Sequence, residues 1–352
     1  MCDAFLDRVL PLLGDNGVLG LGEPTHGTAE AFAGKFEVIH ELARRGLLAT
    51  LAVEESYTVG RRVDAALQGA GDLDAAWSQG SSIWRTATIR TGLRTLRQII
   101  ESQPPEHRTG FLGVDVSKPY RTARDLLDLG VESPLLGAMA DRAVLSSAAV
   151  TALAALCRKL TADGDPAIAA LAGNLARHVD AYLAAPDLAR LHRRDQHMAA
   201  TLLENLPERG ITVLWAHNEH IARNPEGWGG PTMGHVLAEA LGPRYLPIGV
   251  LCGEGTCRAV DPSTGGDDYA AVPLPPIHEG TTDAALTAQD RSLVLGEEFA
   301  HPGPRRFIGW KVDTSLFADD QAVRATFEID RPSSDFAGLA FLPRSTADVT
   351  AP

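Results

Sequence analysis

Short apolar runs recur along this chain and alternate with helical patterns. Each run is too short for a helix and lacks the alternation of a half-exposed strand, which is typical of strands buried on both faces. Between them, apolar residues spaced three or four apart predict helices over 28–45 and 89–102. The alternation predicts a three-layer α/β/α fold with a mainly parallel central sheet. The runs lie at 17–22, 48–53, 111–116, 211–217, 245–253 and 338–343.

The stretch from about 119 to 207 differs from the rest of the chain. It is rich in alanine, leucine and arginine and poor in β-branched clusters. We expect it to form a large helical insertion, or cap, between two strands of the sheet. The whole chain, 1–352, is then expected to be one domain, and 352 residues bury a core large enough to need no metal or disulfide staple.

The charge balance and the N-terminus restrict the partners. Thirty-two Lys and Arg stand against 45 Asp and Glu, a formal net charge of -13, which argues against nucleic acid and anionic membranes. No apolar run reaches the length of a membrane span, and the acidic N-terminal segment does not resemble a signal peptide. We therefore expect a cytoplasmic protein, and we expect it to be a monomer or a homodimer. Four scattered cysteines show no zinc-site spacing, and we expect no cofactor.

Polar residues gather where four of the predicted strands end. Because the carboxyl ends of parallel strands meet at one edge of a sheet, one cleft would collect these groups. They include five carboxylates and three histidines, which point to acid–base chemistry. The clusters are Glu23 to Gly27 after the first strand, Glu54 and Glu55 after the second, Asp115 to Lys118 after the third, and His217 to His220 after the fourth.

The motifs of several enzyme classes are missing from the sequence. There is no G-x-S-x-G nucleophile elbow, no H-E-x-x-H zinc motif and no glycine-rich phosphate loop after a strand. This leaves general acid–base chemistry on water by histidines and carboxylates, or a metal held by the same groups.

Two motifs resemble those of the erythromycin esterase family. They are GEPTHGTAEAF at 22–32 and LWAHNEHIA at 214–222, and the spacing from His26 to Glu54 also agrees with the family. Arg194-Asp195, Met233-Gly234 and DFAGLAFLP at 335–343 are further matches, so that the resemblance runs from about 17 to 346. It implies a three-layer α/β fold with a substantial helical portion.

The resemblance also implies roles for individual residues. His26 is expected to be the general base that activates water for attack on an ester or lactone carbonyl, without a metal. Glu23 and Glu54 would orient or assist it, and His217 and His220 would line the same cleft. The residue chemistry adds that His217 is suited to donate a hydrogen bond to the carbonyl oxygen as charge develops there.

The substrate is less well specified than the acid–base centre. Lys35 stands where macrolide esterases carry an arginine, and we expect its ammonium to extend toward the cleft and bind substrate. Arg90 stands about where the family often has a glutamate. The substrate could be a macrolide, a polyketide or another secondary metabolite. The other expected substrate-binding residues are Trp84, Arg85, Asp115 and Asn218.

Three alternatives remain open at this point. The same histidine and carboxylates would serve a tailoring enzyme of natural-product biosynthesis that closes a ring, transfers an acyl group, eliminates or epimerises. A non-catalytic binding protein would be expected to lose the paired motif residues, which are all present here. A metal-dependent variant is the third alternative. Glu55 is expected to be a solvated or capping neighbour of Glu54, and Arg194-Asp195 to form an internal salt bridge.

Overall fold

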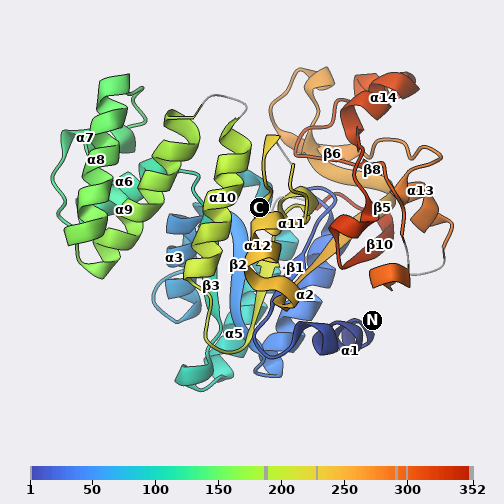
Figure 1. Ribbon diagram of the computed structural model, residues 1–352, viewed down its shortest axis with the longest axis horizontal. Coiled ribbons are helices and arrows are strands. Elements are labelled where there is room, and N and C mark those ends of the chain that lie inside the picture. The colour runs from blue at the N-terminus through green and yellow to red at the C-terminus, as the bar shows by residue number, and fades with distance from the viewer. Residues whose placement is uncertain (1, 186–188, 227–228, 290–291, 299, 349–352) are drawn as a thin grey trace.

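The computed structural model describes residues 2–185, 189–226, 229–289, 292–298 and 300–348, and its centre is one twisted sheet (Figure 1). The strand order is β3-β2-β4-β1-β5-β10-β7, with β6 pairing to the far end of β5. Six neighbouring strands are parallel, and β6 and β7 are antiparallel additions, so the prediction of a mainly parallel sheet is confirmed. The strands are β1 (Val18–Leu21), β2 (Leu48–Ser56), β3 (Gly110–Asp115), β4 (Ile211–Trp215), β5 (Tyr245–Val260), β6 (Tyr269–Pro273), β7 (Leu293–Leu295) and β10 (Gly338–Ser345), with β8 (Arg305–Arg306) and β9 (Glu328–Ile329) pairing separately.

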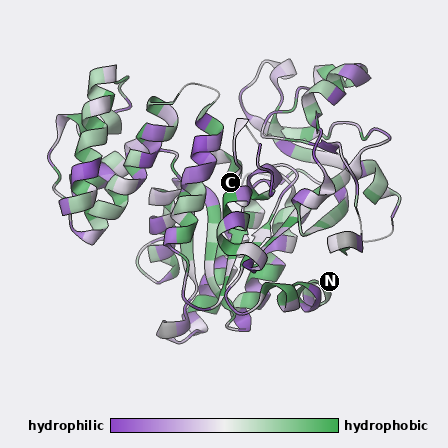
Figure 2. Ribbon diagram, in the orientation of Figure 1, coloured by the Kyte–Doolittle hydropathy of each residue, from purple (hydrophilic) through white to green (hydrophobic). Residues whose placement is uncertain are grey.

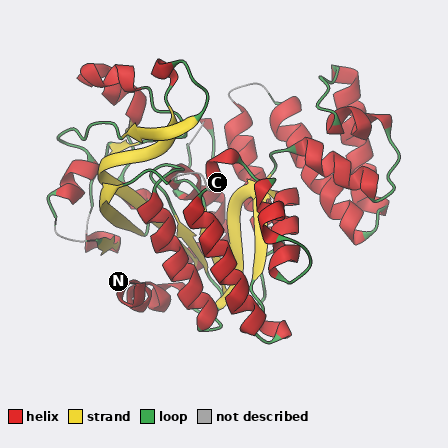
Figure 3. Cartoon of the chain, turned by 180° about the vertical axis from the view of Figure 1, so that it is seen from behind, coloured by secondary structure: helices red, strands yellow, loops and turns green. Residues whose placement is uncertain are grey.

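Helices cover both faces of this sheet, which gives the predicted three layers (Figure 3). One face packs against α1 (Cys2–Leu13), α2 (Ala29–Arg44), α3 (Tyr57–Leu67), α4 (Leu73–Ser78) and α5 (Ala87–Ser102). The other packs against α10 (Ala189–Glu204), α11 (Asn218–Ile221) and α12 (Met233–Leu241). The C-terminal part adds α13 (Thr282–Thr287) and α14 (Asp320–Phe327). Apolar residues concentrate on the sheet and on the helix faces turned toward it (Figure 2).

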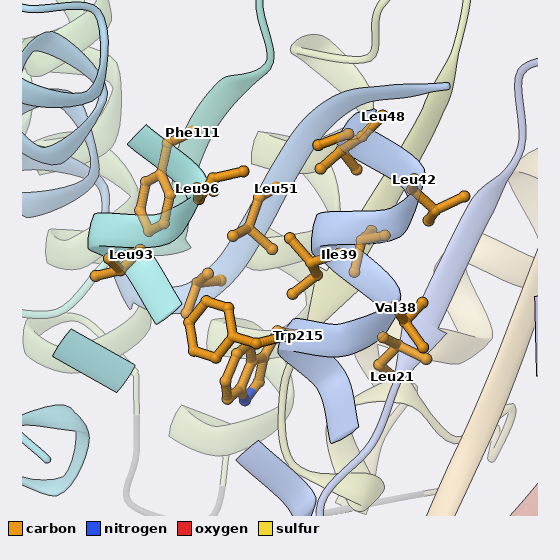
Figure 4. Close-up of a cluster of buried hydrophobic side chains, with 14 of the residues drawn as sticks. Leu21, Val38, Ile39, Leu42, Leu48, Leu51, Leu93, Leu96, Phe111 and Trp215 are labelled. Atoms are coloured by element: carbon orange, nitrogen blue, oxygen red, sulfur yellow. The ribbon is translucent and has the colours of Figure 1, made fainter. Parts of the chain in front are cut away.

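Helix α2 shows how the sequence pattern becomes packing. Its residues Phe32, Phe36 and Ile39 recur at helical spacing and are all buried, and Figure 4 shows Ile39 beside Leu51 of β2. The helix ends at Arg44, and Gly46 follows in the left-handed conformation with φ of 67°. The predicted start at Thr28 is also found, but its side chain makes no capping hydrogen bond. The first amide of α2 is satisfied instead by the C-terminal chain, as described below.

The described residues of the range predicted as an insertion form helices joined by turns and loops, with no strand. It contains α6 (Pro119–Asp128), α7 (Pro134–Ala140), α8 (Ser147–Asp163), α9 (Pro166–His178), a π-helical turn at Val179–Leu183 and then α10; residues 186–188 lie outside the described part. Helices α6 to α9 have an apolar core of their own and lie to one side of the sheet (Figure 1). Within the described chain, no helix is at once long and apolar enough to cross a membrane.

Helices α1 and α3 are among those that the sequence analysis did not predict. Helix α1 contains Pro11, yet Leu6, Val9 and Leu13 fall on one buried face. Helix α3 begins at Tyr57, directly after β2, so no polar loop separates the two elements in the sequence and marks the start of the helix. Strand β5 is also longer than predicted, because it continues past Gly253 to pair with β6.

Candidate active site

The polar clusters that follow β1, β2, β3 and β4 meet at one edge of the sheet. These strands are neighbours in the sheet, so parallel pairing brings their carboxyl ends together. The side chains are buried there: Glu23 is 0% exposed, Glu54 7% and Asp115 5%. Buried charges are stable only when they are paired, and each of these carboxylates is.

Glu23 and His26 form a hydrogen-bonded pair at the end of β1. His26 Nδ1 lies 2.6 Å from Glu23 Oε1, while Glu23 Oε2 accepts from Lys35 Nζ at 2.8 Å and from Trp215 Nε1 at 2.7 Å. Burial raises the pKa of Glu23, but the Lys35 ammonium and His26 outweigh it and leave that pKa below its usual range. Glu23 is therefore an ionised acceptor that holds a proton on His26 Nδ1.

The bond to Glu23 leaves Nε2 as the unprotonated nitrogen of neutral His26. No residue of the described chain bonds to Nε2, and the imidazole keeps about 10% of its side-chain surface exposed. The ring is flanked by Trp84, edge-on at 5.3 Å between centroids, and by His217 at 5.1 Å. Trp84 thus lies against the expected base, and its role in binding substrate stays a prediction.

Lys35 does not extend toward the cleft as predicted. It is 4% exposed, it is bonded to Glu23, and its ammonium lies 4.4 Å from the centre of the Trp215 ring. Burial lowers the pKa of Lys35 to about 8, against the opposing attraction of Glu23. Lys35 contacts Glu23 Oε2, whereas His26 contacts Glu23 Oε1, so the Glu23 carboxylate separates the ammonium from the imidazole.

Arg194 of α10 connects the helical insertion to two strand ends. Its guanidinium donates to Asp115 through Nε at 2.9 Å and through Nη2 at 3.1 Å, and Nη2 also donates to Glu54 Oε1 at 2.9 Å. Burial raises the pKa of Asp115, but Arg194 outweighs it and holds that pKa below the usual range. Arg194 and Asp195 were expected to form an internal salt bridge that locks the helical region to the sheet. Arg194 does link the two, but through Glu54 and Asp115, whereas Asp195 pairs with His220.

His220 lies between two carboxylates. Its Nδ1 is 2.7 Å from Asp195 Oδ1, and its Nε2 is 3.2 Å from Glu54 Oε1, which Arg194 shares. Burial opposes the charge, yet Asp195 and Glu54 raise the pKa of His220 to about 10. In turn His220 and Arg194 overcome the effect of burial and hold the pKa of Glu54 well below its usual value. This half of the site carries two cations next to ionised carboxylates.

His217 has the opposite character. Its Nδ1 accepts from the Glu219 amide at 3.3 Å, and its Nε2 lies 3.2 Å from the Ile308 carbonyl oxygen, so Nε2 carries the hydrogen. Burial and the nearby His26 lower the pKa of His217 to about 3. His217 is therefore neutral, and its hydrogen is directed to Ile308 in this structure, whereas we had expected it to be directed to a substrate carbonyl.

Several other expected contacts differ in the structure. The amide of Asn218 bonds both backbone groups of Val250, at 2.7 and 2.9 Å, so it joins the turn after β4 to β5 and does not face a substrate. Arg85 is exposed next to Trp84. Glu55 is not solvated: it is 1% exposed and pairs with Lys118. Asp115 was expected to bind substrate, but both of its carboxylate oxygens accept hydrogen bonds from Arg194.

Sequence reasoning missed three partners of the site. Trp215 is the last residue of β4 and belongs to the motif at 214–222, but the sequence does not predict that its indole nitrogen donates a hydrogen bond to Glu23. Asp195 was assigned to Arg194, and the role of Arg194 as the partner of Glu54 and Asp115 was not seen. The only sequence signal for the last two was their place in a motif shared with the family.

A cation is already present at the centre of the carboxylate cluster. The Arg194 guanidinium lies between Glu54 and Asp115, where a divalent ion would otherwise compensate their charge. Within the described residues, no three histidine, cysteine, aspartate or glutamate side chains converge as a set of metal ligands.

The geometry defines a class: an α/β protein with a buried histidine–carboxylate centre at the carboxyl edge of a parallel sheet. The sequence model of the erythromycin esterase family matches residues 48–344. The chain belongs to the erythromycin esterase family. The match begins after the Glu23–His26 loop, so the assignment of roles within that loop depends on the geometry described above.

Solved structures with the same fold agree with this assignment. A protein from Bacillus cereus is 18% identical, with a TM-score of 0.76 over 100% of this chain and 94% of that one. A structure described as a succinoglycan biosynthesis protein is 17% identical, with a TM-score of 0.72 over 98% and 92%. A mutant of the erythromycin esterase EreC in its open conformation is 15% identical, with a TM-score of 0.69 over 98% and 94%. At these identities, the likeness shows the fold alone.

Proposed function

We propose that this protein hydrolyses a carboxylic ester or lactone and that His26 is the general base. The observation that carries the proposal is the bond of 2.6 Å between Glu23 and His26 Nδ1, which leaves Nε2 without a partner in the described chain. A neutral histidine with one nitrogen fixed and the other accessible is the arrangement that accepts a proton from water.

The reaction follows from these contacts. Nε2 of His26 takes a proton from a water molecule as its oxygen attacks the carbonyl carbon. The imidazolium that forms is stabilised by ionised Glu23, whose second oxygen is held by Lys35 and Trp215. When the tetrahedral intermediate collapses, His26 returns the proton to the departing alkoxide, and carboxylate and alcohol are released.

The opposite side of the site carries fixed charges that already compensate one another. His220 and Arg194 are both cationic and both border Glu54, 7% of which is exposed. Glu54, Asp115 and Asp195 compensate these two cations, so we assign neither of them to the carbonyl oxygen of the substrate. Because the whole centre is nearly closed, the elements around it must separate for a substrate to reach Nε2.

Family membership supports a search among esters and lactones, and a macrolide lactone is the first candidate. The purified protein should be incubated with erythromycin and, separately, with an activated aryl ester such as p-nitrophenyl acetate. We expect a product heavier than one of these substrates by one water molecule, or its acid and alcohol fragments, in liquid chromatography with mass spectrometry. No turnover of esters or lactones of any size would contradict the proposal.

A biosynthetic tailoring enzyme is the second candidate. It is supported by the fold shared with a succinoglycan biosynthesis protein. The same Glu23–His26 pair would then deprotonate an alcohol in place of water and transfer an acyl group to it. Adding an alcohol acceptor to the ester assay separates the two: a new ester in place of the free acid would favour the tailoring enzyme.

The buried Lys35 predicts a pH limit on activity. Its pKa is lowered to about 8, so its ammonium is present below that pH and is lost above it, and Glu23 then loses its charged partner. We expect kcat/KM to fall as the pH rises through about 8. In the Lys35→Arg variant, whose guanidinium stays charged, this fall should move to higher pH. Superimposable pH profiles for the two proteins would show that Lys35 does not control Glu23.

A further inference from the structure

The last described residues of the chain lie across the loop that carries His26. After β10, residues 346–348, here called the C-terminal strap, turn back toward the start of α2, and Ala347 forms an antiparallel bridge with Thr28. The family match ends at residue 344 and starts at 48, so it includes neither the strap nor the loop beneath it.

Backbone hydrogen bonds join the strap to both ends of the segment after His26. The Gly27 carbonyl accepts from the Asp348 amide at 3.1 Å and also from the Arg258 amide of β5 at 3.0 Å. The Ala29 amide, the first of α2, donates to the Thr346 carbonyl at 2.9 Å. This bond supplies the cap that the Thr28 side chain does not provide.

The strap is in turn anchored by side chains. The Thr346 amide donates to Glu30 Oε2 at 2.8 Å, and the Ala347 amide donates to Thr256 Oγ1 at 3.1 Å. Asp348 is 3% exposed, and its Oδ1 accepts from Thr88 Oγ1 at 3.1 Å. Thr88 lies in the first turn of α5, where the helix dipole favours a carboxylate.

The position of His26 depends on this segment because the imidazole is bonded on one side only. Nδ1 is held by Glu23, and the placement of Nε2 then follows the path of the main chain through Gly27. That path has little freedom on the β5 side, since a Cβ at Gly27 would lie 2.3 Å from the Arg258 carbonyl oxygen. The strap adds a second hydrogen bond to the Gly27 carbonyl oxygen, from the Asp348 amide. A displacement of a base by about 1 Å can cost roughly 10²-fold in rate.

We propose that the C-terminal strap positions His26 for proton transfer, with Asp348 as its principal anchor. The inference builds on the proposed function, since it assigns the strap to the loop of the proposed base. The strap residues touch no reacting atom: they act through Gly27 and through the first turn of α2, the helix that also carries Lys35.

Two truncated chains test the proposal. One ends at Ser345 and lacks the strap; the control ends at Asp348 and keeps it. We expect the chain ending at Ser345 to lose at least about tenfold in kcat with KM nearly unchanged, and its amides at 24–30 to exchange hydrogen at least about tenfold faster, while those of β1 and β4 keep their protection. The control should match the full chain in both measurements.

A point variant covers the case in which the shorter chain does not fold. Asp348→Ala keeps the main chain of the strap but removes its anchor, and we expect it to shift kcat and exchange at 24–30 in the same direction. Asp348→Asn retains an acceptor for Thr88, so it should restore most of kcat and most of the protection from exchange at 24–30. Exchange at 24–30 equal to that of the full chain in Asp348→Ala, or in a folded chain ending at Ser345, would overturn the proposal.

The exchange measurement also separates this proposal from the proposed function. If the protein hydrolyses no ester, the proposed function fails, and protection of residues 24–30 still decides whether the strap holds the loop. If hydrolysis and loop exchange are unchanged by removal of the strap, the positioning role fails while the general base remains.

Discussion

Replacing His26 with asparagine is expected to lower kcat for ester hydrolysis by about 10²- to 10⁴-fold, the usual contribution of a general base. Asparagine is uncharged and of similar polarity, so Glu23 keeps a hydrogen-bonding neighbour, but it has no basic nitrogen to accept a proton from water. The loss should fall on kcat, with KM changed little. Steady-state kinetics on the best substrate found in the screen would measure it.

The matched control is His40→Asn. His40 is also on the α2 side of the sheet, is partly buried, and bonds through Nε2 to the Gly92 carbonyl at 2.9 Å, but it has no contact with the Glu23–His26 pair. We expect this variant to retain activity within a few-fold of the wild type. Equal losses in both variants would mean that removal of a histidine from this region damages the fold and not the chemistry.

Replacing Arg194 with methionine is expected to destabilise the protein by about 3–5 kcal/mol, the cost of leaving buried charges without their partner. Asp115 and Glu54 would both lose the guanidinium that compensates them at about 3 Å, and α10 would lose its ionic link to β2 and β3. The free energy of unfolding, from urea titrations of both proteins at pH 7, measures this effect.

The neighbouring arginine provides the control for Arg194. Arg193 pairs with Asp180 at 3.0 Å, but its side chain is 35% exposed and that of Asp180 is 49% exposed. Exposed pairs contribute about 0–1 kcal/mol, so Arg193→Met should change the free energy of unfolding far less. A similar effect for both arginines would show that Arg194 is not the centre of the buried cluster.

The cost of Arg194→Met should also depend on pH. Arg194 helps to hold the pKa values of Glu54 and Asp115 below their usual range, so its stabilisation is present above the unfolded pKa of about 4 and is lost as the pH falls further. The difference between wild type and variant should therefore shrink below about pH 4. A difference that is constant from pH 7 to pH 3 would point to lost packing in place of lost charge.

Local sequence patterns were sufficient to predict the layers of this fold and the edge where the polar groups meet. The strands are buried on both faces, so their apolar runs stand out, and the parallel order then brings Glu23, Glu54, Asp115 and His217 together without further information. The Glu23–His26 pair is also local, with three residues from one partner to the other, and its resemblance to a family motif pointed to it directly.

The partners that compensate these groups could not be predicted in the same way. Arg194 lies 140 residues from Glu54 along the chain and 79 from Asp115. The spacing of apolar residues in its helix does not tell which strands that helix packs against. Lys35 was expected to extend outward because lysine usually does, whereas the ionised Glu23 beneath it makes burial favourable. The strap reaches Thr28 from Ala347, a contact that depends on the complete path of the sheet.

The most direct test of the central claim, that His26 activates water, is a single turnover in H₂¹⁸O with enzyme in excess over ester. Attack by water activated at His26 Nε2 predicts one ¹⁸O atom in the carboxylate product of that first turnover, and no acyl group on the intact protein by mass spectrometry. An unlabelled first product, or an acylated Glu23, Glu54 or His26, would show that the enzyme itself attacks the carbonyl and would contradict the account.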